Sequence, residues 1–436
     1  KRAFESVVAM LGLAGRAGRR TLGTRRLQPQ LLWLICTALL LGVVPLWSLG
    51  LQPGDRTPLP ASPVFILLWT IGALCALGAA WQAKYHRLAA LALLSGAGLS
   101  TCITFTWFSA PDLALTQLSV EAVTTVLILL GLRWLPRRLE PAETGVQRTA
   151  LATARRTRDL LIAVAAGGGM AALAWAMMSR QFPQSISTFF LERALPEGGG
   201  TNVVNVMLVD FRGFDTFGEI VVLGIVALTV YALLRRFRPA RETLDLPPQQ
   251  RALPADLETD LVNPRLANDT AVGYLMVPAV LMRLVLPLAC MVSVYLFMRG
   301  HNEPGGGFVA GLVMSVALLL QYIVSGTVWV EEHMPLRPRR WIGVGLLTAL
   351  ATGVGSWFLG YPFMTTHTAH LTLPLIGEIY IASALFFDIG VFTLVVGSTL
   401  LVLTALAHQS VRSHRFHARN TDDDDGAADA MVEGGR

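Results

Sequence analysis

Residues 287–324 read "PLACMVSVYLFMRGHNEPGGGFVAGLVMSVALLLQYIV". Two long apolar runs flank a short polar segment in which Arg299, His301 and Glu303 precede Pro304 and three glycines. An apolar run of about 20 residues is long enough to cross a bilayer as a helix. Because proline ends a helix and glycine permits a tight turn, the pattern predicts two membrane-spanning helices joined at a membrane surface.

Apolar runs of this length recur along the whole chain of 436 residues, which is 53% hydrophobic and 15% charged. This composition exceeds the apolar content of soluble domains. None of the runs alternates as barrel strands do. We predict an all-α, polytopic transmembrane protein with about ten helices. The predicted spans are residues 31–50, 64–82, 88–107, 113–132, 160–179, 217–234, 274–298, 308–330, 341–360 and 379–407.

Arginine-rich clusters precede the first predicted span and follow every second one. If all ten spans are real, every cluster falls on one side of the membrane, which the positive-inside rule assigns to the cytoplasm. Both termini are then cytoplasmic, and the polar turn near residue 303 lies at the outer surface. This asymmetry accounts for the net charge of +6, so we predict no nucleic-acid partner.

The longest polar interruption, residues 235–268, contains five prolines and predicts an extended cytoplasmic linker. It separates a six-helix membrane domain (31–234) from a four-helix membrane domain (269–410), here called the six-helix part and the four-helix part. Residues 1–30 predict an amphipathic cytoplasmic lead-in. Residues 411–436 contain few apolar side chains and predict a disordered cytoplasmic tail.

Glu121 is the clearest candidate for ion chemistry, because an ionisable side chain in a bilayer is costly and is usually kept for function. It lies in the middle of a predicted span, and Gln117 and Thr125 lie one helical turn away on the same face. A desolvated carboxyl group there suits reversible proton or cation binding. The alternative is a protonated glutamic acid bonded to a neighbouring helix.

Asp215 and Glu219 are also candidates for an ion path, since a spacing of four residues places them on one helix face. They follow residues 202–214, an apolar stretch with polar interruptions that predicts an interfacial or re-entrant helix. The alternative is a helix N-terminus, where acidic residues are favoured by the helix dipole.

Arg283 and Asp388 fall within predicted spans and would be costly without partners, so we predict a structural ion pair between them. The pattern contains no complete metal-ligand set and no cofactor motif, and we predict neither a metal nor a cofactor. The chain has only two lysines, Lys1 and Lys84, and none lies in a predicted span. A complete relay of membrane lysines and glutamates would therefore have to come from other membrane subunits.

Three long strings resemble Mrp-type multisubunit cation/proton antiporters. "FSAPDLALTQLSVEAVTTVLILLGLRWLP" and "GGGTNVVNVMLVDFRGFDTFGEIVVLGIVAL" are similar to the C-terminal part of the family's large A-type polypeptide. "RGHNEPGGGFVAGLVMSVALLLQYIVSG", with "LPLIGEIYIASALFFDIGVFTLVVG", is similar to its B-type polypeptide. The resemblance covers about residues 21–408 and implies an A–B fusion without the antiporter-like N-terminal half of the A-type polypeptide.

The resemblance implies a multi-pass protein of the inner (plasma) membrane that works in Na⁺/H⁺ antiport, beside other membrane subunits and within the lipid bilayer. It implies an ion path through Glu121, Asp215 and Glu219, and a transporter rather than an enzyme. Two alternatives stay open at this point. One is a structural membrane adaptor with no ion path, and the other is a self-sufficient secondary transporter.

Overall fold

The computed structural model describes residues 2–22, 27–50, 54–56, 60, 62–83, 86–132, 146–181, 185–236, 276–373 and 377–433. Within these residues, nine helices are long and apolar enough to span a membrane, which confirms the polytopic helical class. They are α3 (Pro63–Gln82), α4 (Arg87–Trp107), α5 (Pro111–Leu132), α6 (Val146–Met178), α9 (Gly213–Arg236), α11 (Met276–Arg299), α12 (Gly307–Ser325), α14 (Pro338–Phe358) and α15 (Ala384–Glu433).

The first predicted span, 31–50, corresponds to α2 (Leu27–Leu49), whose described apolar stretch is Gln28–Val44. That stretch is shorter than the other nine. Most of the predicted linker, residues 237–268, lies outside the described residues. The cytoplasmic placement of both termini stays a prediction.

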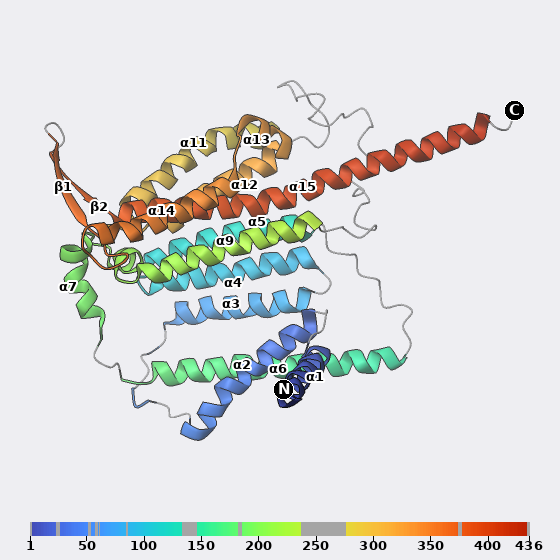
Figure 1. Ribbon diagram of the computed structural model, residues 1–436, viewed down its shortest axis with the longest axis horizontal. Coiled ribbons are helices and arrows are strands. Elements are labelled where there is room, and N and C mark those ends of the chain that lie inside the picture. The colour runs from blue at the N-terminus through green and yellow to red at the C-terminus, as the bar shows by residue number, and fades with distance from the viewer. Residues whose placement is uncertain are drawn as a thin grey trace. The chain divides into compact units, whose positions relative to one another are not determined.

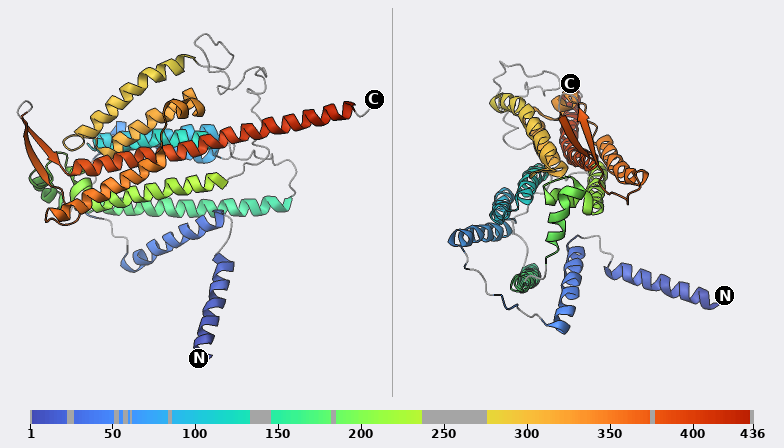
Figure 2. Two further views of the ribbon diagram at one scale, coloured as in Figure 1. Left: turned by 45° about the horizontal axis from the view of Figure 1, so that its top comes forward. Right: turned by 90° about the vertical axis from the view of Figure 1, so that its left-hand side faces the viewer.

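The chain forms two compact units, drawn in Figures 1 and 2. The first unit comprises residues 1–61 and 139–185 and contains α1 (Arg2–Leu22), α2 and α6. Within it α2 packs against α6. The segment after α2 is tied to the end of α6, because Gly54 N–H donates to Ser179 Oγ (3.0 Å) and Arg56 N–H donates to the Ser179 carbonyl (2.9 Å).

The second unit, residues 62–138 and 186–436, is a bundle of long helices built around α12 and α15. Helix α12 packs against α11, α5 and α15, while α15 also packs against α14 and α9. The helices α3, α4 and α5 continue outward in one layer (Figure 1). Since α5 and α9 come from the six-helix part, both predicted parts share one core. Its fully buried side chains include Ile220, Leu319, Phe387, Val391, Leu394 and Val395.

Gly345 of α14 and Gly390 of α15 allow the two helices to approach closely, because a side chain at either of these positions would strike the backbone of the other helix. A Cβ atom at Gly345 would lie 2.7 Å from the Gly390 carbonyl oxygen, and one at Gly390 would lie 2.8 Å from the Ala349 nitrogen. Gly343, two residues earlier on α14, has open space around it. The tight face of α14 is therefore the face turned towards α15.

A two-stranded hairpin is the one departure from the all-α prediction within the described part of the chain. Strand β1 (Thr368–Leu373) pairs antiparallel with β2 (Gly377–Ala382), with Thr368 opposite Ala382. The predicted span 379–407 begins too early, because Ile379 belongs to β2 and the helix starts at Ala384. An apolar run that passes from strand to helix without a break hides this boundary from hydropathy.

Two further helical segments bear on predictions from the sequence. The lead-in forms the helix α1 from Arg2 to Leu22. At the other end, α15 continues to Glu433 and includes most of the segment predicted to be a disordered tail. Residues 411–433 contain no proline, so nothing in the sequence forces the preceding helix to stop.

Candidate functional site

Glu121 lies at the middle of α5 and faces α4. A Cβ atom at Gly98 of α4 would collide with the Glu121 carboxylate, so this glycine leaves the space that the carboxylate occupies. One turn further along α5, Thr125 Oγ1 lies 2.8 Å from Ser95 Oγ of α4. Glu121 and Thr125 therefore meet a glycine and a hydroxyl group of the same neighbouring helix.

Asp215 and Glu219 lie in the first two turns of α9, and both are exposed on the surface of this chain. Asp215 forms an ion pair with Arg212. Helix α9 packs mainly on α15 and α14, whereas α5 packs mainly on α4 and α12. Among the described residues, no hydrogen bond or ion pair joins Glu121 to either acid.

Arg283 and Asp388 have different neighbours, so the ion pair predicted between them is not formed. The Arg283 guanidinium lies over the Trp329 ring at 4.8 Å. The Asp388 carboxylate lies beside the start of α12, where a Cβ atom at Gly307 would lie 3.1 Å from Asp388 Oδ1. Arg283 lies in the first turns of α11 and Asp388 in the first turns of α15, and chain connectivity puts these two helix starts at opposite ends of the bundle.

The polar turn between α11 and α12 is held by the six-helix part. Gly305 N–H donates to Asp112 Oδ1 (2.9 Å), and Asn202 Nδ2 donates to Asp112 Oδ2 (3.3 Å). Asn202 Nδ2 also contacts the carbonyl oxygens of Gly300 (3.1 Å) and Glu303 (3.0 Å). This network joins the two predicted parts through groups that are not adjacent in sequence.

Asn202 also fixes the start of the next segment. Its side-chain oxygen accepts from Val204 N–H and Asn205 N–H, which caps α8 (Val203–Val206). A π-helix, η1 (Met207–Phe211), follows directly and carries Asp210. The interfacial helix predicted for residues 202–214 is thus a short capped turn and a π-helix that lead into α9.

Burial raises the pKa of Asp210 above its ordinary value, and a hydrogen bond from Thr366 N–H (2.7 Å) opposes that rise. A raised carboxyl pKa means that the folded state binds more protons than the unfolded state, so the contribution of Asp210 to stability falls as pH rises through the range from its unfolded to its folded pKa. The ionised Asp210 carboxylate therefore lowers the free energy of unfolding at neutral pH, and this penalty disappears when the carboxyl group is protonated.

Asp210→Asn should raise thermal stability at neutral pH relative to the wild type, because the amide oxygen can still accept from Thr366 and the buried charge is gone. The gain should vanish in acid. Asp210→Ala should lower stability by about 1–3 kcal/mol, since Thr366 N–H loses its acceptor. Thermal unfolding of the purified complex at both pH values tests this, and a wild type that gains stability over Asp210→Asn as pH rises would contradict it.

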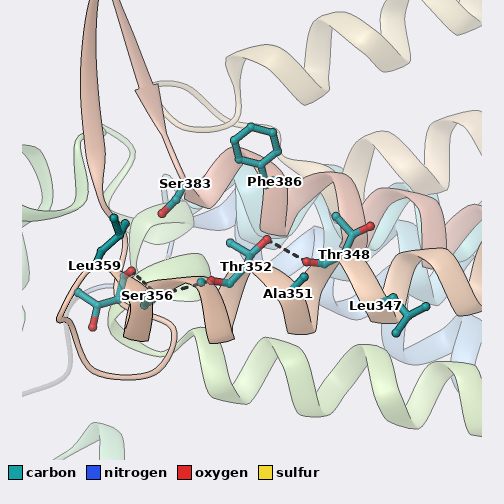
Figure 3. Close-up of a pocket in the computed structure, with 10 residues that line it drawn as sticks. Leu347, Thr348, Ala351, Thr352, Ser356, Leu359, Ser383 and Phe386 are labelled. Carbon is teal, nitrogen blue, oxygen red and sulfur yellow. Dashed lines mark hydrogen bonds between the residues drawn. The ribbon is translucent and has the colours of Figure 1, made fainter.

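A cavity of about 550 Å³ lies on α14 beside the start of α15 (Figure 3). Two of its hydroxyl groups already donate to backbone, Thr352 to the Thr348 carbonyl (2.9 Å) and Ser356 to the Thr365 carbonyl (2.9 Å). None of the predicted acids lines it. The lining of the cavity is mainly apolar.

Comparison with known proteins assigns both parts of the chain. Family models for the D and E subunits of MBH match residues 71–137 and 154–251, respectively. A model described as "Domain related to MnhB subunit of Na+/H+ antiporter" matches residues 277–401. The chain is 38% identical to the B subunit of the Na⁺/H⁺ antiporter of Bacillus subtilis over 127 residues, which is 29% of this chain and 89% of that protein.

The match also extends over nearly the whole chain. The A/B subunit of a probable K⁺/H⁺ antiporter of Rhizobium meliloti is 54% identical over 96% of this chain. The solved structure of the Mrp complex from Dietzia sp. DQ12-45-1b has a chain that superposes with a TM-score of 0.71 at 26% identity and covers 93% of this chain. The chain belongs to the Mrp-type antiporter subunit family. It covers 42% of the Rhizobium meliloti protein and 42% of the Dietzia chain.

As an Mrp-type protein, the chain is a fusion of a C-terminal A-type part and a B-type part, and it is a multi-pass protein of the plasma membrane. The network around Asp112 and Asn202 is therefore the junction between an A-type part and a B-type part. We call the side chains of Asp112, Asn202, Asn205, His301 and Asp388 the junction cluster.

Sequence reasoning did not single out most of the junction cluster. In the sequence, Asp112 has the position of an ordinary acidic residue in the first turn of a helix, and Asn205 is one polar residue within an apolar stretch. His301 is visible within the glycine-rich turn, but nothing in the linear sequence shows that Asn205, nearly a hundred residues earlier, bonds to it. The only available signal is the concentration of polar residues at predicted helix ends.

Proposed function

We propose that this chain is a membrane subunit of a multisubunit monovalent cation/proton antiporter, and that Glu121 lies on its cation or proton path. The carboxylate stands at mid-helix in a predicted membrane span. Within the described residues, no side chain neutralises it or donates to it. An intramembrane carboxylate without a fixed partner is suited to exchange one cation for another.

The observation that supports this role best is the space at Gly98. A larger residue there would displace the Glu121 carboxylate, whereas glycine lets it lie against α4. Asp215 and Glu219 are exposed on this chain, so we place them at a contact between subunits or at a hydrated mouth of the path. The junction cluster then has a structural role, which is to hold the B-type part on the A-type part.

The transported cation is proposed only as a monovalent ion. The Rhizobium meliloti relative is named for K⁺ and the Bacillus subtilis relative for Na⁺. Both ions must therefore be assayed. Exchange should require the other membrane subunits, because the membrane spans of this chain contain no lysine that could complete a proton relay.

The test is to neutralise Glu121, Asp215 and Glu219 one at a time in the complete complex. Each variant is measured for co-purification of the subunits and for Na⁺/H⁺ and K⁺/H⁺ exchange in membrane vesicles. Intact assembly with lost exchange supports an ion path. Lost assembly would instead support a structural adaptor. The exposed positions of Asp215 and Glu219 are compatible with that role.

A further inference from the structure

A basic pocket of about 480 Å³ lies where three membrane helices end together. Its lining comes from α9, from α13 (Thr327–His333) and the segment after it, from α14 and from α15. The apolar spans of these helices end at Arg235 in α9, begin at Pro338 in α14 and end at His408 in α15. The pocket therefore lies at a membrane surface, and the arginine pattern of the sequence assigns that surface to the cytoplasm.

Three arginines line this pocket, and only one of them is fixed by a partner within the chain. Arg339 donates to the Tyr231 hydroxyl, and its guanidinium carbon lies 4.2 Å from the centre of the Tyr231 ring. Arg337 and Arg340 are exposed, and among the residues that the structure describes no hydrogen bond or ion pair holds their guanidinium groups. Two cationic groups of the lining are therefore free to bind an anion.

The acidic residue in the described lining does not neutralise these arginines. Glu331 Oε1 lies 2.8 Å from His408 Nε2, so its carboxylate is bonded on the side of α15. Much of the remaining lining is apolar, with the buried Leu401 of α15 and the half-buried Met334 and Leu336. The pocket thus combines a basic portion with an apolar portion, as the headgroup and the upper acyl chains of a phospholipid require.

The start of α14 also favours an anion in this pocket. The first N–H groups of a helix have no intrahelical partner and carry partial positive charge. Helix α14 has 21 residues, and no side chain caps its N-terminus, since Arg337 at the cap position makes no such hydrogen bond. Proline at positions 335 and 338 restricts the backbone of the segment that carries the arginines.

We propose that this pocket binds the phosphate group of an anionic phospholipid, with Arg337 and Arg340 donating to the phosphate oxygens. A guanidinium group matches a phosphate through two parallel hydrogen bonds, and basic pockets between membrane helices suit lipid headgroups. The positive-inside rule requires arginines on this side of the membrane, but it does not require them to line a cavity together with apolar side chains. The apolar portion favours a lipid over a soluble phosphate.

A lipid at this site would contact both parts of the fusion. Tyr231 belongs to the A-type part, whereas the three arginines and Leu401 belong to the B-type part. The junction cluster joins the same two parts at the opposite end of the bundle. The bound lipid would therefore stabilise the A–B contact at the inner surface. This proposal concerns a lipid and does not depend on the proposed ion path.

The experiment is photo-cross-linking of the complete complex in phosphatidylcholine nanodiscs. The probe is phosphatidylglycerol with a photoreactive group near its headgroup, and phosphatidylcholine with the same group measures non-specific labelling. Mass spectrometry identifies the labelled peptides. We expect phosphatidylglycerol to label residues 331–341 and 401–408 in excess over phosphatidylcholine.

The variant that tests the arginines is Arg337→Gln/Arg340→Gln. The excess labelling should fall by about tenfold or more, because each arginine near an anionic lipid contributes several-fold to binding. Arg155→Gln/Arg156→Gln is the matched control, since it removes the same charge from exposed positions of α6 that do not line the pocket. The control should leave the labelling of residues 331–341 unchanged.

Equal labelling of the wild type by the two lipids would overturn the proposal. An excess that the glutamine pair leaves unchanged, or that the control pair lowers equally, would also overturn it. If added inorganic phosphate abolishes the excess, the pocket binds a soluble anion and the assignment to a lipid fails. If the glutamine pair does not assemble, Thr404→Trp takes its place, because it fills the pocket without changing its charge, and undiminished labelling of that variant would contradict the site.

Discussion

Glu121→Gln is expected to abolish or strongly reduce cation/proton exchange while the complex still assembles. Glutamine keeps the size of the side chain and its place against Gly98, so packing between α4 and α5 should be preserved. It cannot change its charge, and therefore cannot release a proton when a cation arrives. The measurements are exchange in vesicles across a range of pH values and co-purification of the subunits.

Four matched variants test this result further. Glu121→Asp keeps the charge and should retain part of the activity. Gly98→Ala retains Glu121 but pushes its carboxylate away from α4. This variant should therefore reduce exchange without removing any ionisable group. Asp215→Asn and Glu219→Gln should have smaller or pH-shifted effects, because both acids are exposed on this chain. Full exchange in Glu121→Gln with an unchanged pH profile would remove Glu121 from the ion path.

Gly307→Ala should cause a large loss of stability at the junction. A Cβ atom there would strike the backbone carbonyl of Asp388, so α12 could not keep its present contact with α15. Overpacking of this kind typically costs about 1–3 kcal/mol and sometimes more. The neighbouring Gly306 is restricted as well, since it has φ +101° and a Cβ atom there would lie 2.6 Å from Asn205 Nδ2. The backbone of the turn therefore has no room to shift away from a methyl group at position 307.

Gly343→Ala is the control for this substitution, because Gly343 lies inside a membrane helix with open space around it. Alanine favours a helix over glycine by roughly 0.5–1 kcal/mol, so this variant should be neutral or slightly stabilised. Thermal unfolding of the complex and the yield of assembled subunits distinguish the two variants. Equal stability of Gly307→Ala and Gly343→Ala would contradict the close packing of α12 on α15.

The helical membrane class could be predicted from sequence because hydropathy and length act locally along the chain. Spans such as α5 and α12 follow their apolar runs to within a few residues. The hairpin could not be predicted in the same way, since Ile379 is apolar in a strand and in a helix alike. The start of α15 at Ala384 is set by pairing between β1 and β2, which a hydropathy window does not detect.

Residues of the candidate site could be predicted only where a single ionisable side chain lies within an apolar span. Glu121 stands out because an acid in the middle of a span is costly wherever the helix packs. Asp388 is also an acid within a span, but its neighbours could not be derived from sequence. The expected pair with Arg283 is not formed, because the two residues lie near the starts of different helices at opposite ends of the bundle. The junction cluster depends on contacts between distant segments, and these exist only in the folded chain.

The most direct test of the proposed function is cation/proton exchange in vesicles from cells without other antiporters. Three preparations are compared: the complete complex, the complex assembled without this chain, and this chain alone. We expect Na⁺/H⁺ or K⁺/H⁺ exchange from the complete complex and none from the other two. Undiminished exchange by a complex that lacks this chain would show that it is not part of the antiporter, and robust exchange by the chain alone would show a self-sufficient transporter instead.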